Sequence, residues 1–155
     1  MEEGHRRSMK KTKRAPGSIR AQVAAMPIRY RSSGAMEVLL VTSRTTQRWI
    51  VPKGWPIKGL TPAEAAAREA YEEAGVVGQI TSEPIGRYTY WKRMSDHFVL
   101  CEATLFRLDV ERQFETWPEQ GQRESRWFSL DDAANLVDEP ELATAMRMLQ
   151  VAVAA

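Results

Sequence analysis

The sequence has few of the residues that mark secreted, membrane-spanning or repetitive proteins. It contains a single cysteine, Cys101, in 155 residues, so no internal disulfide can form, and the apolar run around Cys101 indicates a buried small side chain. No apolar run approaches the roughly 18 residues of a membrane-spanning helix, and no signal-peptide core follows the charged start. The sequence also has no internal repeat. These absences exclude a disulfide scaffold and a repeat solenoid, and they predict a cytoplasmic protein without a membrane partner.

The charge is distributed unevenly along the chain. The net charge is +2, but residues 1–20 hold seven basic and two acidic side chains, a local balance of +5. We predict a basic, flexible tail over residues 1–20 and one domain over residues 21–155, since the length suits one core. Such a tail can be simply solvated or can touch a polyanion. The sequence favours the first reading, so nucleic acid is not an expected partner.

The remaining chain alternates between strand and helix patterns. Apolar residues at strand spacing, separated by turn residues, predict strands over residues 22–30, 36–43, 49–54, 85–93, 97–108 and 126–130. Helical spacing predicts helices over residues 62–74 and 140–155, and a polar stretch over residues 111–125 predicts a loop. This order indicates an α/β (α+β) fold in which helices cover a mixed β-sheet.

The helix over residues 62–74 has clear start and stop signals. Thr61 and Glu64 form a capping-box pattern, Pro62 suits the first helical position, and Gly75 suits the left-handed residue that ends a helix. At about 100° per residue, Ala63, Ala67, Ala70 and Ala74 share one face, and three glutamates share the other. The glutamates are Glu69, Glu72 and Glu73.

Three neighbouring carboxylates repel one another, and a nearby cation would relieve this repulsion. Arg68, four residues before Glu72, is expected to pair with it and orient its carboxylate. All-oxygen ligation favours Mg²⁺ or Mn²⁺, which can be completed by substrate phosphates. The chemistry indicated is metal-assisted hydrolysis of a phosphoric anhydride, although acidic residues opposite an alanine face more often form only a solvated surface.

The stretch from Gly54 to Val76 resembles the signature of the Nudix hydrolases. The matching residues are Gly54, Arg68, Glu69, Glu72, Glu73, Gly75 and Val76. The signature's first glutamate is replaced by Leu60, and its aliphatic position is the smaller Ala70. The resemblance implies an α/β/α sandwich with a loop-helix-loop catalytic motif. Because Leu60 replaces this glutamate, an alternative remains: the protein is a catalytically weak or inactive Nudix-like module that has a binding or regulatory role and uses the basic tail.

The resemblance also implies roles for individual residues. Glu69 and Glu73 are expected to bind the metal, Glu72 to be a further ligand or the general base, Arg68 to orient them, and Gly54 to shape the loop. The family often adds a carboxylate from a later loop, for which Glu119 is preferred over Glu124.

The motif is most similar to the branch that hydrolyses diphosphoinositol polyphosphates and diadenosine polyphosphates, and nucleoside diphosphate-linked substrates also fit the family. The expected contacts to the phosphates are Lys53, Lys58, Arg87 and Lys92, although each can also be an ordinary surface cation. The aromatic residues of strand 85–93 can stack a base or simply pack in the core. His97 is a weaker substrate candidate, and a homodimer is a family-level expectation.

Overall fold

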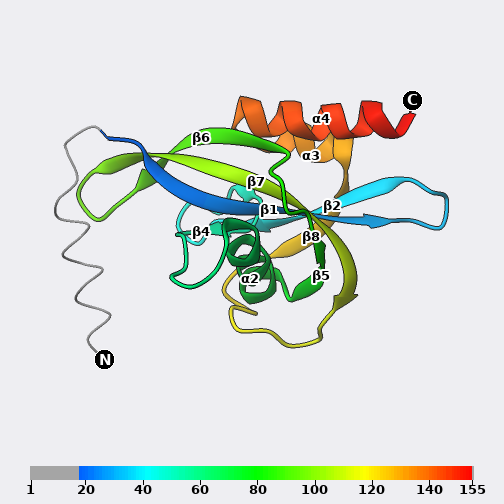
Figure 1. Cartoon of the computed structure of the whole chain (residues 1–155), viewed down its shortest axis with the longest axis horizontal. Helices are drawn as coiled ribbons and strands as arrows, with labels where there is room; N and C mark the ends of the chain where they lie inside the picture. Colours follow the sequence, from blue (N-terminus) through cyan, green and yellow to red (C-terminus); the bar gives the residue numbers. More distant parts are fainter. Residues whose placement is uncertain (1–17, 155) are drawn as a thin grey trace.

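The computed structural model describes residues 18–154, which form one mixed sheet with helices on both faces (Figure 1). The helices are α2 (Pro62–Ala74), α3 (Leu130–Leu136) and α4 (Pro140–Ala154). The strands are β1 (Arg20–Tyr30), β2 (Met36–Thr42), β3 (Trp49–Ile50), β4 (Lys53–Gly54), β5 (Val76–Ile80), β6 (Gly86–Arg93), β7 (Phe98–Gln113) and β8 (Ser125–Ser129). In this part of the chain, no helix is long and apolar enough to cross a membrane.

The long strand β7 lies at the centre of the sheet. It pairs in parallel with β1, and it pairs antiparallel with β6 and with β5 at successive positions along its length. On the far side, β1 pairs antiparallel with β2 and β4, and β2 pairs with β3 and β8. The sheet is therefore mixed, as the sequence predicts, and the hairpin expected over residues 22–43 is confirmed.

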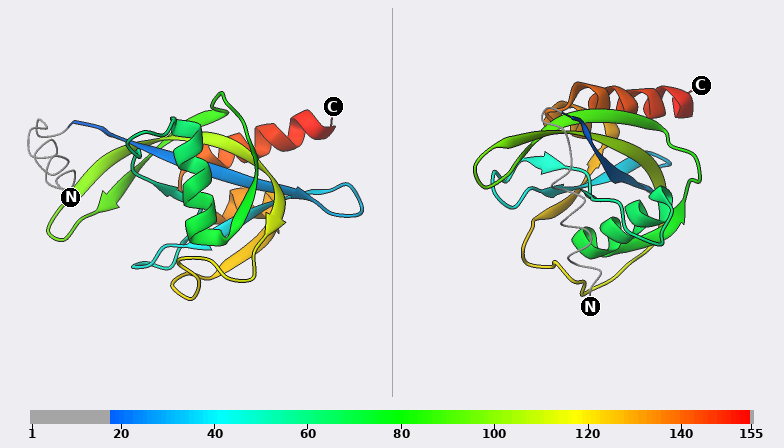
Figure 2. Two further views of the ribbon diagram at one scale, coloured as in Figure 1. Left: turned by 60° about the horizontal axis from the view of Figure 1, so that its bottom comes forward. Right: turned by 60° about the vertical axis from the view of Figure 1, so that its left-hand side comes forward.

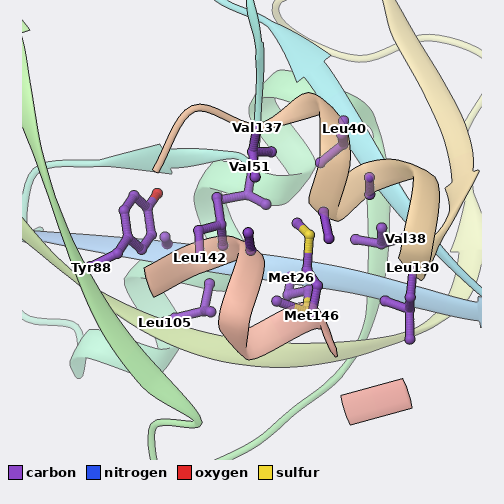
Figure 3. Close-up of a cluster of buried hydrophobic side chains, with 14 of the residues drawn as sticks. Met26, Val38, Leu40, Val51, Tyr88, Leu105, Leu130, Val137, Leu142 and Met146 are labelled. Atoms are coloured by element: carbon purple, nitrogen blue, oxygen red, sulfur yellow. The ribbon is translucent and has the colours of Figure 1, made fainter. Parts of the chain in front are cut away.

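Two apolar layers hold the helices to the sheet. On one face, Met26 of β1 and Leu105 of β7 pack against Leu142 and Met146 of α4, and all four side chains are almost fully buried (Figure 3). On the other face, α2 packs its alanines against β-strand residues such as Val41 and Leu108. Figure 2 shows α2 crossing the sheet on the face opposite to α3 and α4. The chain is thus the α/β/α sandwich that the resemblance implies.

Several boundaries differ from those predicted. Strand β7 continues to Gln113, three residues into the expected loop, because Val76 of the unforeseen strand β5 pairs with Gln113. The expected strand over residues 49–54 divides at Val51 and Pro52 into β3 and β4. Arg20 already belongs to β1, residues 18 and 19 precede it without regular secondary structure, and the tail prediction for residues 1–17 lies outside the described residues.

Candidate active site

Helix α2 begins and ends where its sequence predicts. The backbone N–H of Glu64 donates to the Thr61 hydroxyl at 3.1 Å, and the backbone N–H of Thr61 donates to the Glu64 carboxylate at 2.9 Å, so the capping box is complete. Gly75 ends the helix with φ 73°, and a β-carbon there would lie 2.5 Å from the ring of Trp117. Gly75 therefore both closes α2 and admits the loop after β7.

The buried face of α2 is rotated from the predicted one. Ala63, Ala66, Ala70 and Ala74 are buried, but Ala67 is half-buried and Glu73 is only 5% exposed. The prediction placed Glu73 on the side of the helix opposite its buried alanine face. The burial of Glu73 differs from this, because the chain beyond β7 covers that side of the helix. Glu73 consequently needs partners inside the protein.

Gly54 holds the strand β4 against the carboxylate of Glu69. A β-carbon on Gly54 would lie 2.4 Å from Cδ of Glu69, far inside any permitted contact. Only a residue without a side chain allows β4 and the Glu69 carboxylate to lie this close. This is a physical reason for glycine at position 54, which we expect to shape the loop.

The segment after β7 is tied to the end of α2 by its backbone. The N–H of Glu119 donates to the carbonyl oxygen of Glu72 at 2.9 Å, and the N–H of Phe114 donates to that of Gly75 at 2.8 Å. These bonds satisfy carbonyl groups that the end of α2 leaves without helical partners. They also bring Glu119 beside the glutamates of α2.

Arg123, which the sequence reasoning missed, is the cation of this cluster. Its Nε donates to Glu119 at 3.1 Å, its Nη1 donates to the carbonyl oxygen of Thr42 at 3.1 Å, and its Nη2 lies 3.6 Å from Glu73. In contrast, Arg68 is exposed and makes no ion pair with Glu72 among the residues described here. The expected Arg68–Glu72 pair is therefore wrong, and only the fold reveals Arg123, since it lies 50 positions after Glu73.

A polar cavity of about 490 Å³ gathers most of the expected site residues. Of those predicted from the sequence, it is lined by Lys53, Gly54, Glu69, Glu72, Glu73, Lys92 and Glu119. Further lining residues that the sequence did not point to include Gln22, Arg44, Trp55 and Arg123. Arg93, from the basic and aromatic strand over residues 85–93, also lines the cavity.

Other expected site residues lie elsewhere. Lys58 is exposed outside the cavity, and Arg87 lines a separate, apolar cavity between the start of β6 and α4. Glu124 points to solvent and pairs with Arg126 at 2.9 Å. His97 is also exposed and bonds Asp96. The structure thus separates these residues from the carboxylate cluster, because a pattern in the sequence does not say which side of a strand or loop faces the site.

Burial shifts the protonation of the groups in the cavity. The pKa of Glu73 is raised to about 8, chiefly by burial, with Arg123 opposing the shift. The pKa of Glu69 is raised to about 6, again chiefly by burial, and a hydrogen bond with the Glu73 carboxyl group opposes the shift. The pKa of Lys53 is lowered to about 8, chiefly by burial. Burial thus favours the uncharged form of each of these three groups.

The donor set of the cavity suits a hard divalent cation. Oε1 of Glu73 is buried without a hydrogen-bond partner, and burial raises the pKa of Glu69 and of Glu73, a shift that a bound cation would oppose. Carboxylate oxygens are the ligands that Mg²⁺ and Mn²⁺ prefer. Among the residues described, no three acidic, histidine or cysteine side chains are already close enough together to hold an ion. The carboxylates of Glu69, Glu72, Glu73 and Glu119 line the same cavity, and their oxygen atoms are of the kind that such an ion binds.

Leu60, the position that departs from the signature, has an apolar environment. Its side chain packs against the buried cluster between α2 and the sheet, and it does not line the cavity. Its backbone N–H donates to the carbonyl oxygen of Ile57 at 3.1 Å, which closes the turn before Thr61. Leu60 therefore serves packing in this chain.

The comparisons with known proteins agree with this geometry. The model of the NUDIX domain matches residues 20–149. Nudix hydrolase 21 (chloroplastic) of Arabidopsis thaliana is 38% identical over 121 residues, covering 76% of this chain and 59% of that protein. Diphosphoinositol polyphosphate phosphohydrolase 2 of Rattus norvegicus is 35% identical over 111 residues, covering 70% and 58%.

A solved structure of a C. elegans Ap4A hydrolase in a binary complex shares the fold, with a TM-score of 0.64, 23% identity, and coverage of 88% of this chain and 98% of that one. The chain spans less than two thirds of the length of the curated relatives above. With a signature helix, a carboxylate-lined cavity and a domain match over most of its length, this chain belongs to the Nudix family.

Proposed function

We propose that this protein is a divalent-metal-dependent hydrolase of phosphoric anhydride bonds. The observation that carries the proposal is the shared cavity, in which Glu69, Glu72, Glu73 and Glu119 meet the cations Lys53 and Lys92. Carboxylates are suited to bind a metal ion, and the two lysines are suited to bind phosphate groups. The same cavity would therefore bind both the metal ion and the phosphates of the substrate. The similarity to a diphosphoinositol polyphosphate phosphohydrolase and to the fold of an Ap4A hydrolase supports the same chemistry.

Each residue of the proposed site has a role that its position supports. Glu69 and Glu73, with Glu119, would hold Mg²⁺ or Mn²⁺, which when bound supplies charge neutralisation at the phosphoryl oxygens. Glu72 lines the cavity and would accept a proton from the attacking water. The water oxygen would then bond to one phosphorus of the anhydride, the bridging P–O bond would break, and the phosphate on the other side would leave. Gly54 allows the close approach of Glu69, and Arg123 positions Glu73 and Glu119.

The proposed substrate is a nucleoside diphosphate-linked compound, a dinucleoside polyphosphate or a diphosphoinositol polyphosphate. Lys53 and Lys92 are the proposed phosphate contacts, whereas Lys58 and Arg87 are not, because they lie outside the cavity. We also propose a cytoplasmic location, on the basis of the sequence, and a homodimer, on the basis of the family resemblance.

The experiment is a screen of the hydrolysis products of these three substrate classes at millimolar Mg²⁺ or Mn²⁺, repeated in EDTA. We expect turnover of at least one class that EDTA abolishes. Turnover that EDTA leaves unchanged would contradict the metal requirement.

A second function is favoured by one observation, the apolar packing of Leu60 where the signature has a glutamate. In that case the protein would bind a phosphorylated ligand without hydrolysing it. Absence of turnover on the whole panel, together with salt-sensitive binding of RNA that is lost on deletion of residues 1–17, would support this second function.

A further inference from the structure

The hairpin of β6 and β7 has an exposed apolar face. Trp91 of β6 is 63% exposed and Phe98 of β7 is 61% exposed. Trp91 pairs with Leu100, and Phe98 lies two residues before Leu100, so the three side chains lie on one face of the hairpin. Tyr90, on the other face, is buried in the core. The two exposed rings are therefore diagonal neighbours on a face that the core does not use.

Ile19 extends this face across a third strand. Arg20 of β1 pairs in parallel with Cys101 of β7, and the same register places Ile19 beside Leu100. Ile19 is 53% exposed. The start of β1 and the turn between β6 and β7 lie at the same end of the sheet (Figure 1 and Figure 2). We name the four side chains at this end the hairpin patch: Ile19, Trp91, Phe98 and Leu100.

The hairpin patch has positive charge beside it. Strand β6 carries three cations and no acidic residue. Two of these cations, Arg87 and Arg93, share the face of Trp91, are exposed and form no ion pair among the residues described. The stretch of β7 that pairs with β6 carries one acidic residue. The sequence before the sheet, residues 1–17, holds six basic and two acidic residues, so positive charge dominates on both sides of the patch along the chain.

These features fit a phospholipid surface better than other partners of an exposed patch. A second copy of the chain, packed patch to patch, would bring like charges together. A peptide would need pockets for its side chains, and neither Trp91 nor Phe98 lines the carboxylate-lined cavity or the apolar cavity beside α4. RNA would stack its bases on aromatic rings, whereas two of the four side chains are aliphatic. An anionic membrane surface accommodates both features, since apolar side chains enter the boundary between headgroups and acyl chains while cations contact the phosphates.

We propose that the hairpin patch binds the protein to the surface of a membrane that contains anionic phospholipids. Ile19, Trp91 and Phe98 enter the membrane interface, and the cations of β6 and of residues 1–17 contact lipid headgroups. Each contribution alone gives weak, reversible binding, and the two together give stable attachment. Peripheral attachment needs no membrane-spanning helix, so it is compatible with the helices described. The rings lie outside the carboxylate-lined cavity, so the inference does not depend on the proposed function.

Cosedimentation with vesicles tests the hairpin patch. The full chain is mixed with phosphatidylcholine vesicles that contain about 30% phosphatidylserine, and with vesicles of phosphatidylcholine alone. We expect binding to the anionic vesicles that Trp91→Ser and Phe98→Ser each weaken by about tenfold, and at least tenfold weaker binding to the neutral vesicles. Met148→Ser is the control, because Met148 is also 63% exposed but lies on α4, and it should weaken binding less than about twofold. No binding by the wild-type chain, or equal losses in the three variants, would overturn the inference.

Fluorescence quenching tests which ring enters the lipid. Brominated phosphatidylcholine quenches tryptophans that lie at the acyl chains, and the variant Trp91→Phe keeps an apolar ring at that position. We expect this variant to bind the anionic vesicles within about threefold of the wild type and to lose most of the quenching. Quenching that is unchanged in Trp91→Phe would show that another tryptophan enters the lipid and would overturn the patch.

The basic residues and the competing ligand RNA are tested with the same full-length chain. Replacement of the six basic residues of 1–17 by glutamine should weaken binding to the anionic vesicles by tenfold or more, and so should a rise in salt concentration. Binding that neither change affects would overturn the role of the basic segment. Binding of single-stranded RNA that Trp91→Ser and Phe98→Ser weaken, with no binding to anionic vesicles, would show that the patch is an RNA surface and would overturn the membrane inference.

Discussion

Nη2 of Arg123 lies 3.6 Å from Oε2 of Glu73, and their side chains are only 10% and 5% exposed. The same guanidinium donates to Glu119 and to the backbone of Thr42. A single arginine therefore links the buried glutamate of α2, the loop after β7 and the end of β2. The acidic cluster is held by this tertiary contact, and the neighbouring Arg68 of the helix takes no part in it.

Removal of this cation should destabilise the protein. In Arg123→Gln, Glu73 remains buried without its positive neighbour, so we expect the free energy of unfolding to fall by about 1–3 kcal/mol at pH 7. The matched variant Arg68→Gln should change it by less than about 0.5 kcal/mol, since Arg68 is exposed. Urea denaturation in EDTA measures both values. Equal losses in the two variants would refute the assignment of Arg123 as the partner of Glu73.

The pH dependence of stability should have an unusual sign in the metal-free protein. The pKa of Glu73 is raised from 4.5 to about 8, so the folded state keeps a proton that the unfolded chain loses, and this contribution to stability falls as the pH rises between those values. The pKa of Lys53 is lowered from 10.5 to about 8, so its contribution rises with pH above about 8. We expect these two groups together to contribute least near pH 8.

The measurement is the free energy of unfolding in EDTA for the wild type and for Glu73→Gln at several pH values. The wild-type value minus the variant value should decline from pH 5 to pH 8, and millimolar Mg²⁺ should reduce the decline because the ion binds the ionised carboxylates. A difference that grows with pH over this range would contradict the raised pKa of Glu73.

A side chain at Gly54 should reduce activity by displacing the Glu69 carboxylate. In Gly54→Ala the new β-carbon would displace the Glu69 carboxylate, and a displacement of about 1 Å at such a site costs on the order of 100-fold in kcat/KM. Gly86→Ala is the control, because its β-carbon would meet only Ala145 at 3.9 Å. Steady-state hydrolysis by both variants tests this; comparable activities would show that β4 can move away from Glu69.

Leu60 should matter for stability and not for turnover. Leu60→Ala removes apolar contact from the cluster under α2, so we expect the free energy of unfolding to fall by about 1–2 kcal/mol while kcat stays within about threefold. Leu60→Glu, which restores the signature residue, should destabilise the chain without raising kcat. An increase of tenfold or more in kcat for Leu60→Glu would show that the missing glutamate limits catalysis.

The sequence predicts those features that depend on neighbouring residues. Thr61, Glu64 and Gly75 are enough to place both ends of α2, because caps are local backbone chemistry. The apolar pattern of residues 97–108 likewise predicts the central strand, since only a strand covered on both faces is apolar on both. The glutamates that share one turn of helix are brought to one cavity for the same local reason.

The sequence cannot predict features that depend on how distant segments meet. Strand β5 follows Gly75 without a turn signal and is stabilised by pairing with the end of β7, more than 30 residues later. The rotation of α2 that buries Glu73, and the choice of Arg123 over Arg68, both follow from the loop that covers the helix. The separation of Lys58 and Arg87 from Lys53 and Lys92 is set by the same tertiary geometry.

The central claim is that the buried carboxylates of α2 perform metal-dependent hydrolysis, and one comparison tests it most directly. Glu73→Gln and the matched exposed variant Glu124→Gln are assayed at saturating Mg²⁺ on the best substrate of the panel. We predict that kcat of Glu73→Gln falls by about 10²–10⁴-fold and that kcat of Glu124→Gln stays within about twofold of the wild type. Full activity in a folded Glu73→Gln variant would contradict the account.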